Sequence, residues 1–234
     1  MAVKTKIQIR RDTAANWTST NPTLAEGELG FETNSELFKI GNGSNDWNSL
    51  SYFNQTKLTA NSQSTGLDTY DRQILNNNAA LFTSGGLFLS FFTPSENITI
   101  SSITFVSGST NVSGTPTLVR IGLFTYDETT LTLVAATASD TNIGATANTA
   151  YTRSLSTDGS LPSTYQLVRG NRYAIGLLQV GATNISGVGC SGSNNVLSSL
   201  PPRLSGTVSG LSDLPTSTTS VTNTTSRPWF RVTV

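Results

Sequence analysis

Histidine is absent from this 234-residue chain, and cysteine and methionine each occur once. Without histidine, neither a Ser-His-Asp nor a Cys-His catalytic apparatus can be assembled, and a histidine-ligated zinc is excluded. The single cysteine, Cys190, cannot form a disulfide within the chain. These absences remove several classes of enzyme and of metal site, so we expect neither a cofactor nor a metal.

Charge is also scarce, since charged residues make up 12% of the chain and cancel to a formal net charge of zero. A protein that binds nucleic acid needs basic residues to neutralise phosphates, so we expect no nucleic-acid partner. No apolar run approaches the roughly 20 residues that span a bilayer. The first residues, MAVKTKIQIRR, lack the apolar core of a secretory signal. The sequence therefore predicts a protein made in the cytoplasm, without a signal peptide and without membrane insertion.

One motif resembles a nucleotide-binding fingerprint in its spacing alone. Residues Gly187–Gly192 have the form G-x-G-x-x-G, but Ser193-Asn194-Asn195 and Pro201-Pro202 follow them instead of an amphipathic helix. A dinucleotide fingerprint requires this motif between a strand and a helix. We therefore interpret the segment as a flexible loop.

A glycosidase would need two carboxylates placed on either side of the scissile bond. The candidate pairs are Asp127 with Glu128 and Asp140 with Asp158, and all four lie where the sequence predicts turns. Acidic residues are common in turns for structural reasons. No repeat period is visible that would indicate a β-helix. The chain is predicted not to be an enzyme, with a cell-wall or capsule hydrolase as the least favoured alternative.

The first 53 residues form the most strongly patterned part of the chain. Alternation of apolar and polar residues predicts strands ending at Arg10, over Glu28–Thr33 and over Leu37–Ile40, with one helical turn at Thr13–Trp17. A Gly-rich turn follows at Gly41–Gly43. Two Trp, three Phe and one Tyr occur in this stretch, which is much apolar area for a small module to bury alone.

We therefore predict that several copies associate and bury one another's apolar faces, which would also protect the edges of short strands. The alternative is a small monomeric β cap that lies on the downstream domain. The residues predicted to form the oligomer core are Ile7, Ile9, Trp17, Leu29, Phe31, Phe38, Ile40 and Trp47.

The same stretch carries an ordered series of motifs. They are Arg10-Arg11, Thr13-Ala14-Ala15 with Trp17, Leu24-Ala25-Glu26-Gly27-Glu28, Phe31-Glu32-Thr33, Phe38-Lys39-Ile40-Gly41-Asn42-Gly43 and Trp47-Asn48-Ser49-Leu50. This series resembles the N-terminal domain of the phage major tropism determinant proteins, which is found on tail-fibre and related virion proteins. The resemblance implies an intertwined trimeric β-prism and a homotrimer mounted on a virion, in contact with other virion proteins. It does not identify a receptor, nor whether the mounting is on the tail or the capsid.

Residues 54–85 are polar and are predicted to be a connector. A trimeric coiled coil would need apolar residues at heptad positions over three or four heptads, and barely one is present. From residue 86 to residue 234, short apolar strands alternate with turns rich in Gly, Ser, Asn and Pro, which is typical of a β-sandwich. Strands are predicted at Ile98–Ile100 and Leu118–Tyr126, and the strands Tyr165–Val168 and Tyr173–Leu178 are expected to form a hairpin-like pair. We predict a jelly-roll-like sandwich of about eight strands, whose last strand ends at the final residue.

Ser, Thr, Asn and Gly dominate the long loops of this C-terminal domain and can form hydrogen bonds with sugar hydroxyls. Aromatic rings can also stack on sugars, although in a sandwich most of them are core residues. The candidates for receptor binding are Tyr126, Tyr151, Tyr165 and Trp229. The sequence as a whole predicts an all-β, trimeric virion adhesin that binds a host surface glycan or protein. The alternative is a structural virion protein, such as a capsid fibre, decoration or tail adaptor subunit.

Overall fold

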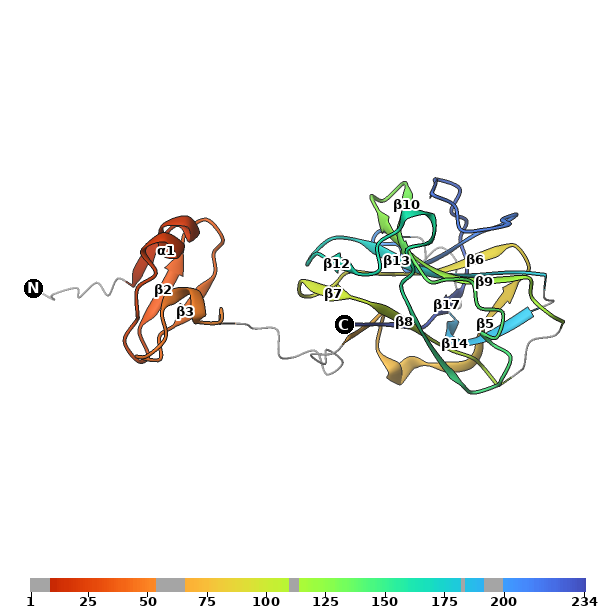
Figure 1. Cartoon of the computed structure of the whole chain (residues 1–234), viewed down its shortest axis with the longest axis horizontal. Coiled ribbons are helices and arrows are strands. Elements are labelled where there is room, and N and C mark those ends of the chain that lie inside the picture. The colour runs from red at the N-terminus through yellow and green to blue at the C-terminus, as the bar shows by residue number, and fades with distance from the viewer. Residues whose placement is uncertain (1–8, 54–65, 110–113, 182–183, 192–199) are drawn as a thin grey trace, which may run out of the picture. The chain divides into compact units, whose positions relative to one another are not determined.

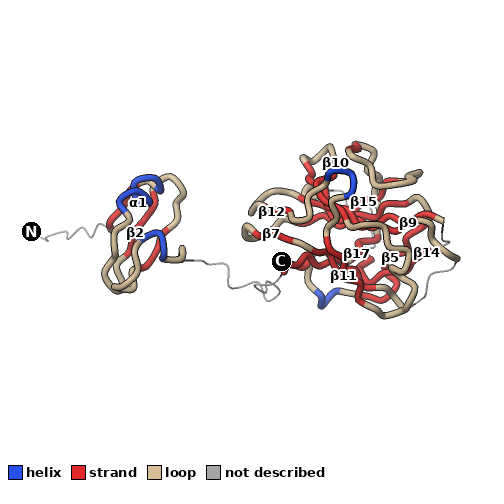
Figure 2. Tube along the Cα trace, in the orientation of Figure 1, coloured by secondary structure: helices blue, strands red, loops and turns tan. Residues whose placement is uncertain are grey.

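The computed structural model describes residues 9–53, 66–109, 114–181, 184–191 and 200–234 of the chain. The chain divides into two compact units, residues 1–60 and 61–234, drawn in Figure 1. Figure 2 shows that strands dominate the C-terminal unit, and the chain as a whole has the predicted all-β class. Among the described residues, no helix is long and apolar enough to cross a membrane.

The N-terminal unit contains a three-stranded sheet. Its elements are β1 (Arg10–Asp12), α1 (Ala14–Thr20), β2 (Leu29–Glu32), β3 (Phe38–Ile40) and the 3-10 helix η1 (Trp47–Ser49). The central strand, β2, pairs in parallel with β1 and antiparallel with β3. The predicted strand that ends at Arg10 lies mostly outside the described residues, and β1 begins where it was expected to end.

Two capping residues determine where helix α1 begins and ends. The hydroxyl of Thr13 accepts a hydrogen bond from the amide of Asn16, which satisfies one free donor of the first turn. At the other end Asn21 adopts the left-handed conformation (φ 45°) and donates its amide to the carbonyl of Trp17. Pro22 follows and disfavours any continuation. The predicted helical turn is therefore confirmed and extended to seven residues, with Trp17 on its buried side.

The C-terminal unit is a β-sandwich. Its strands are β4 (Gly66–Asp68), β5 (Asn76–Thr83), β6 (Gly86–Phe92), β7 (Ile98–Ile100), β8 (Ser102–Val106), β9 (Leu118–Tyr126), β10 (Leu131–Ala136), β11 (Ala150–Ser154), β12 (Tyr165–Leu167), β13 (Tyr173–Val180), β14 (Asn184–Ser191), β15 (Ser205–Val208), β16 (Ser217–Thr218), β17 (Ser226–Pro228) and β18 (Phe230–Thr233), with 3-10 helices η2 (Arg72–Ile74) and η3 (Asp158–Ser160).

Four sheets are formed by these strands. The largest has the order β15-β6-β13-β9-β10-β16, and a four-stranded sheet has the order β11-β8-β18-β4. A three-stranded sheet has the order β17-β14-β5, and β12 pairs with β7. The predicted sandwich is confirmed, but the described residues of this unit form fifteen strands and not about eight, and its jelly-roll connectivity stays a prediction.

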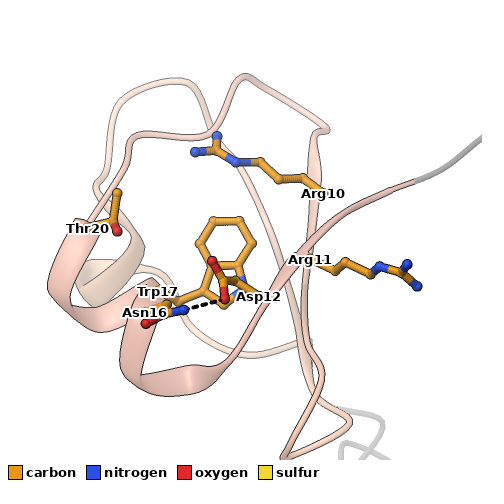
Figure 3. A pocket seen from close by; sticks show the side chains of 6 residues that line it. All are labelled: Arg10, Arg11, Asp12, Asn16, Trp17 and Thr20. Carbon is orange, nitrogen blue, oxygen red and sulfur yellow. Dashed lines mark hydrogen bonds between the residues drawn. The ribbon is translucent and has the colours of Figure 1, made fainter.

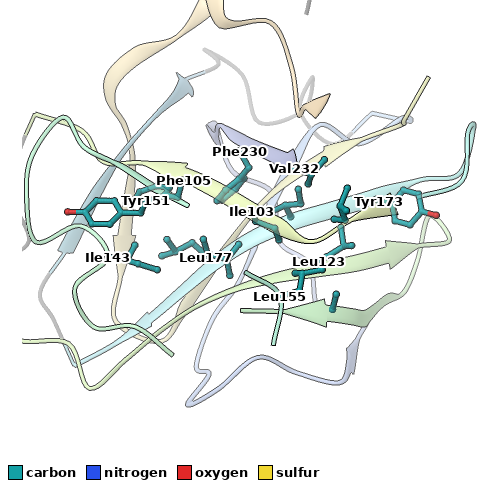
Figure 4. Packing of buried hydrophobic residues seen from close by; sticks show 14 of the residues in the cluster. Ile103, Phe105, Leu123, Ile143, Tyr151, Leu155, Tyr173, Leu177, Phe230 and Val232 are labelled. Carbon is teal, nitrogen blue, oxygen red and sulfur yellow. The ribbon is translucent and has the colours of Figure 1, made fainter. Parts of the chain in front are cut away.

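Apolar residues lie on both faces of the six-stranded sheet. On the inner face they pack against the four-stranded sheet, and Figure 4 shows Leu123 and Leu177 meeting Ile103, Phe105 and Phe230 there. On the outer face a second cluster is covered by the segment that carries Leu211, Leu214 and Val221. This double burial explains why β6 and β13 have near-continuous apolar sequences.

The structure differs from three sequence-based expectations. Residues 66–83, assigned to the polar connector, contain β4 and β5, because each pairs with a strand from the far C-terminal part of the chain. The segments around β12 and β13 were expected to form a hairpin, but β12 pairs with β7 while β13 lies between β6 and β9.

The third difference is the Gly187–Gly192 motif, whose first five residues belong to strand β14 and not to a flexible loop. Glycine is required there because a Cβ on Gly187 would lie 2.7 Å from the ring of Phe82 and 2.8 Å from that of Phe105. A strand can therefore be poor in large side chains when neighbouring rings fill the space.

Strand β4 joins the start of the C-terminal unit to its end. Gly66 lies opposite Thr233 of β18 in an antiparallel pair. The Asp68 carboxylate is almost fully buried, at 2% side-chain exposure, and binds Arg231 at 2.8 Å and Arg72 at 2.6 Å. The chain thus enters this unit beside its own last strand, which confirms the prediction that the terminus is held in a sheet.

Replacing Asp68 with alanine is expected to lower the free energy of unfolding of the C-terminal unit by about 3 kcal/mol, because Arg231 keeps a largely buried charge without its carboxylate. Urea unfolding followed by circular dichroism measures the change. The matched control is Asp158→Ala, whose side chain is exposed and which should change stability by no more than about 0.5 kcal/mol. Equal stability of the two variants would show that the Asp68 cluster does not hold the unit together.

Candidate functional site

The N-terminal unit has a core of its own. The rings of Trp17 and Trp47 stack with centroids 4.1 Å apart and planes 13° apart, and Leu24 and Leu50 complete the cluster. Both tryptophans are at most 3% exposed. A Cβ on Gly30 of β2 would lie 2.5 Å from the Trp47 ring, so the sheet needs glycine where the ring crosses it.

This core corrects one inference from the sequence. A single copy does enclose Trp17 and Trp47, so these two of the predicted oligomer-core residues belong to the interior of one copy. The indole N–H of Trp17 also finds its acceptor within the unit, the carbonyl of Phe31 at 3.0 Å. The two stacked rings bury much of each other's apolar surface, so one copy needs no larger core to enclose them. The number of aromatic residues in the sequence does not reveal this stacking.

Charged and polar groups lie between the sheet and the Trp47 ring. Lys39 is 5% exposed, donates to the carbonyl of Trp47 at 2.8 Å, and lies 4.8 and 4.4 Å from the rings of Trp47 and Tyr52. Burial lowers the pKa of Lys39, and the nearby Glu32 opposes that shift. Tyr52 donates to Glu32 at 2.6 Å, and burial together with this carboxylate raises the pKa of Tyr52 to about 12.

These contacts hold the chain across the end of the sheet after Trp47. Tyr52 forms a β-bridge with Lys39, and the amide of Phe53 donates to the carbonyl of Phe38. The Phe53 ring then stacks on Phe38, with centroids 4.9 Å apart. Phe53 was not among the predicted oligomer-core residues. In the sequence, only its position at the end of the predicted module indicated that it packs with this unit.

The opposite side of the sheet is mostly apolar, with Arg11 opposite Phe31, and the described residues of the unit leave it uncovered. Leu29 lies opposite Ile40, and Phe31 lies opposite Phe38, so these four side chains share one face by strand alternation. Ile9, Leu29, Ile40 and Phe53 are 43, 38, 39 and 49% exposed, and Phe31 and Phe38 are half-buried. We call this surface the outer face; it comprises Ile9, Leu29, Phe31, Phe38, Ile40 and Phe53.

Five of the eight predicted oligomer-core residues therefore lie on the outer face, two lie in the internal core, and Ile7 lies outside the described residues. An exposed contiguous apolar surface on a small soluble unit is typical of a protein interface. The surface is built from both strand pairs, so its shape depends on the fold that the buried tryptophans maintain.

A small hollow lies on the helix side of the sheet and is shown in Figure 3. Its volume is about 60 Å³, and Arg10, Asp12, Asn16 and Trp17 are among its lining residues. Arg10 lies 5.1 Å above the Trp17 ring, and hydrogen bonds, first that from the Asn16 side chain, lower the pKa of Asp12. The hollow is far smaller than the roughly 300–1,000 Å³ of small-molecule pockets. We assign no ligand to it.

Three of the four receptor-binding candidates in the C-terminal unit are buried. Tyr126, Tyr151 and Trp229 are 8, 7 and 5% exposed. The hydroxyls of Tyr126 and Tyr151 bond to loop backbone within the unit, and the guanidinium of Arg72 lies 5.1 Å from the Trp229 ring. These rings cannot stack on an external sugar. Tyr165 keeps part of its surface exposed, with its ring edge against Tyr173.

Two of the four candidate acids, Asp127 and Asp140, are engaged in turn hydrogen bonds or an ion pair. Asp127 accepts three hydrogen bonds in its turn, and those from the Thr130 and Thr129 amides and the Thr129 hydroxyl lower its pKa. At Asp140 burial acts to raise the pKa, but hydrogen bonds from Asn142 and the ion pair with Arg153 lower it overall. A glycosidase general acid needs a raised pKa, which neither residue has. The described residues hold no group of three or more potential metal-ligating acids and thiols.

The family comparison agrees with the geometry of the N-terminal unit. Residues 7–45 match the family model of the major tropism determinant N-terminal domain. The N-terminal unit is therefore similar to a tropism determinant N-terminal domain. The match spans β1, α1, β2 and β3, and confirms the resemblance inferred from the motif series. No curated protein matches the chain.

Proposed function

We propose that this chain is a subunit of a phage virion adhesin, made in the host cytoplasm and mounted on the virion through its N-terminal unit. The observation that carries the proposal is the match of residues 7–45 to the N-terminal domain of the major tropism determinant, a family named for phage tropism. The outer face supports a role in assembly, because a soluble unit gains free energy when such a surface is covered.

The partner that covers the outer face is a second and a third copy of the chain. Full burial of a Leu, Ile or Phe side chain contributes about 1.5–3 kcal/mol, so even partial covering of six such residues contributes several kcal/mol per copy. A closed three-fold arrangement leaves no copy with its face exposed. It also brings three C-terminal units together, which strengthens weak receptor contacts through effective concentration.

The C-terminal unit is proposed to bind a host surface glycan or protein. Purified full-length protein should compete with the phage that carries this chain for adsorption to its host, and antibodies against the chain should label the virion in electron micrographs. Labelling without any inhibition of adsorption would favour the second candidate.

That second candidate is a structural virion subunit without receptor binding, such as a capsid fibre, decoration or tail adaptor protein. One observation favours it: Tyr126, Tyr151 and Trp229 are buried, so the C-terminal unit does not display them as a stacking surface. With three of the four aromatic candidates buried, a receptor site on this unit would rely mainly on polar contacts.

A further inference from the structure

The two ends of the sandwich in the C-terminal unit differ in their relation to the rest of the chain. Strand β8 begins at Ser102, opposite Thr233, and ends at Val106, opposite Ala150 of β11. Since Thr233 also pairs with Gly66, the start of β8 marks the end at which the chain enters the unit. We call the opposite end, where β8 ends and β11 begins, the far end.

Charge is distributed unevenly between these ends. The described connections at the far end, residues 107–109, 114–117, 137–149 and 181, contain a single charged residue, Asp140, and the segment after β15 adds Asp213, which pairs with Arg120. The Asp140 carboxylate pairs with Arg153 at 2.6 Å, so this charge is compensated. Turns at the entry end, by contrast, contain several exposed charged residues, among them Glu96, Asp127 and Arg169.

The far-end loop that leads into β11 is held rigidly by buried groups. Ile143 is fully buried and anchors the loop in the inner core. The hydroxyl of Tyr151 accepts the amide of Thr146 at 2.8 Å and donates to its carbonyl at 3.1 Å. The hydroxyl of Ser107 donates to that same carbonyl at 2.7 Å and accepts the amide of Thr149 at 2.9 Å. The amide of Asn148 donates to the carbonyl of Gly108.

Residues beneath the loop form hydrogen bonds with its backbone amides and carbonyls. The polar side chains of the loop can therefore form hydrogen bonds with an external partner. Thr141, Thr146 and Asn148 are exposed, and their side chains form no hydrogen bond with the described part of the chain. Hydroxyl and amide groups both donate and accept, as sugar hydroxyls do. A loop fixed before binding also loses less conformational entropy on binding than a mobile one.

We propose that this far-end loop, centred on Thr141, Thr146 and Asn148, is the receptor-binding surface and that its partner is an uncharged, hydroxyl-rich saccharide. The inference rests on the proposed adhesin function and specifies the site and the ligand class. A strongly anionic or cationic partner is disfavoured because the loop offers no uncompensated opposite charge. Tyr151, a predicted stacking residue, acts instead as a positioning residue that fixes Thr146.

The test uses full-length protein and intact cells of the phage host as the probe. Thr146→Ala with Asn148→Gly removes two polar side chains, and glycine retains the positive φ of 50° found at Asn148. We expect affinity for the cells to fall about tenfold or more, since two lost hydrogen bonds account for a loss of that order. The matched control, Thr164→Ala with Asn171→Ala in the turns before β12 and β13, should bind within about twofold of wild type.

Two treatments of the cells test the ligand class. Mild periodate oxidation, which cleaves vicinal diols of saccharides, should abolish binding by the wild-type protein, and protease treatment should leave it intact. The Tyr151→Phe variant should weaken binding and stay folded, with the far-ultraviolet circular dichroism of wild type, although its unfolding temperature falls because the Thr146 amide loses its acceptor.

The outcomes separate the two proposals. A Thr146/Asn148 variant that binds as tightly as wild type overturns the assignment of the loop and leaves the adhesin function standing. Binding that survives periodate but is lost after protease treatment overturns the saccharide class. Wild-type protein that does not bind host cells overturns the adhesin function itself, together with this inference.

Discussion

Replacement of Leu29 with arginine is expected to convert the full-length protein from a trimer into a monomer. Leu29 lies on the outer face opposite Ile40 and is 38% exposed in a single copy. A charge at this position would be buried without a partner at the interface, which costs several kcal/mol per copy. Light scattering should report three times the 24.8 kDa chain mass for wild type and one chain mass for the variant.

The matched control for this variant is Ala15→Arg, which adds the same charge on the exposed side of α1, away from the outer face. It should remain trimeric. The Leu29 variant should also keep the near-ultraviolet circular dichroism of stacked indoles, because Trp17 and Trp47 lie on the other side of the sheet. A trimer that tolerates arginine at Leu29 would show that the outer face does not form the interface.

Replacement of Trp47 with alanine is expected to unfold the N-terminal unit while the C-terminal unit stays folded. Truncation of a buried Trp costs about 3–5 kcal/mol. Among the described residues of this unit, four form the internal core, so little stability remains once the stacked pair is broken. Limited proteolysis should degrade residues 1–53 of the variant and leave a stable fragment that contains the C-terminal unit.

The two variants fail in different ways, which separates folding from assembly. The Leu29 variant should be a folded monomer, whereas the Trp47 variant should lose both its N-terminal fold and its assembly. A Trp47 variant whose N-terminal unit resists protease as well as wild type would contradict the role assigned to the stacked tryptophans.

Much of the fold could be predicted because the decisive signals are local. Alternation gave β9 and β7 with their observed bounds, and the cap residues at Thr13 and Asn21 enclose α1. Strands β4 and β14 could not be predicted in this way. Strand β4 depends on pairing with β18 across most of the sequence, and β14 is glycine-rich because the rings of Phe82 and Phe105 occupy the space beside it.

The sequence predicted which residues contribute to the candidate surfaces, but not which of them would be exposed. The sequence identified the apolar residues of the N-terminal module, yet it could not tell which face each would occupy, since Trp17 and Trp47 turn inward only after α1 and η1 fold over the sheet. In the C-terminal unit, Tyr126, Tyr151 and Trp229 were recognised as aromatic residues with two possible roles. Packing decides between those roles, and packing is not local in sequence.

The most direct test of the account is the binding of full-length protein to intact host cells, compared between wild type and the Leu29→Arg variant at equal chain concentration. We expect wild type to bind and the monomeric variant to bind at least about tenfold more weakly, because three linked C-terminal units raise avidity without any new contact. Failure of trimeric wild-type protein to bind its host would contradict the adhesin account and favour a structural role in the virion.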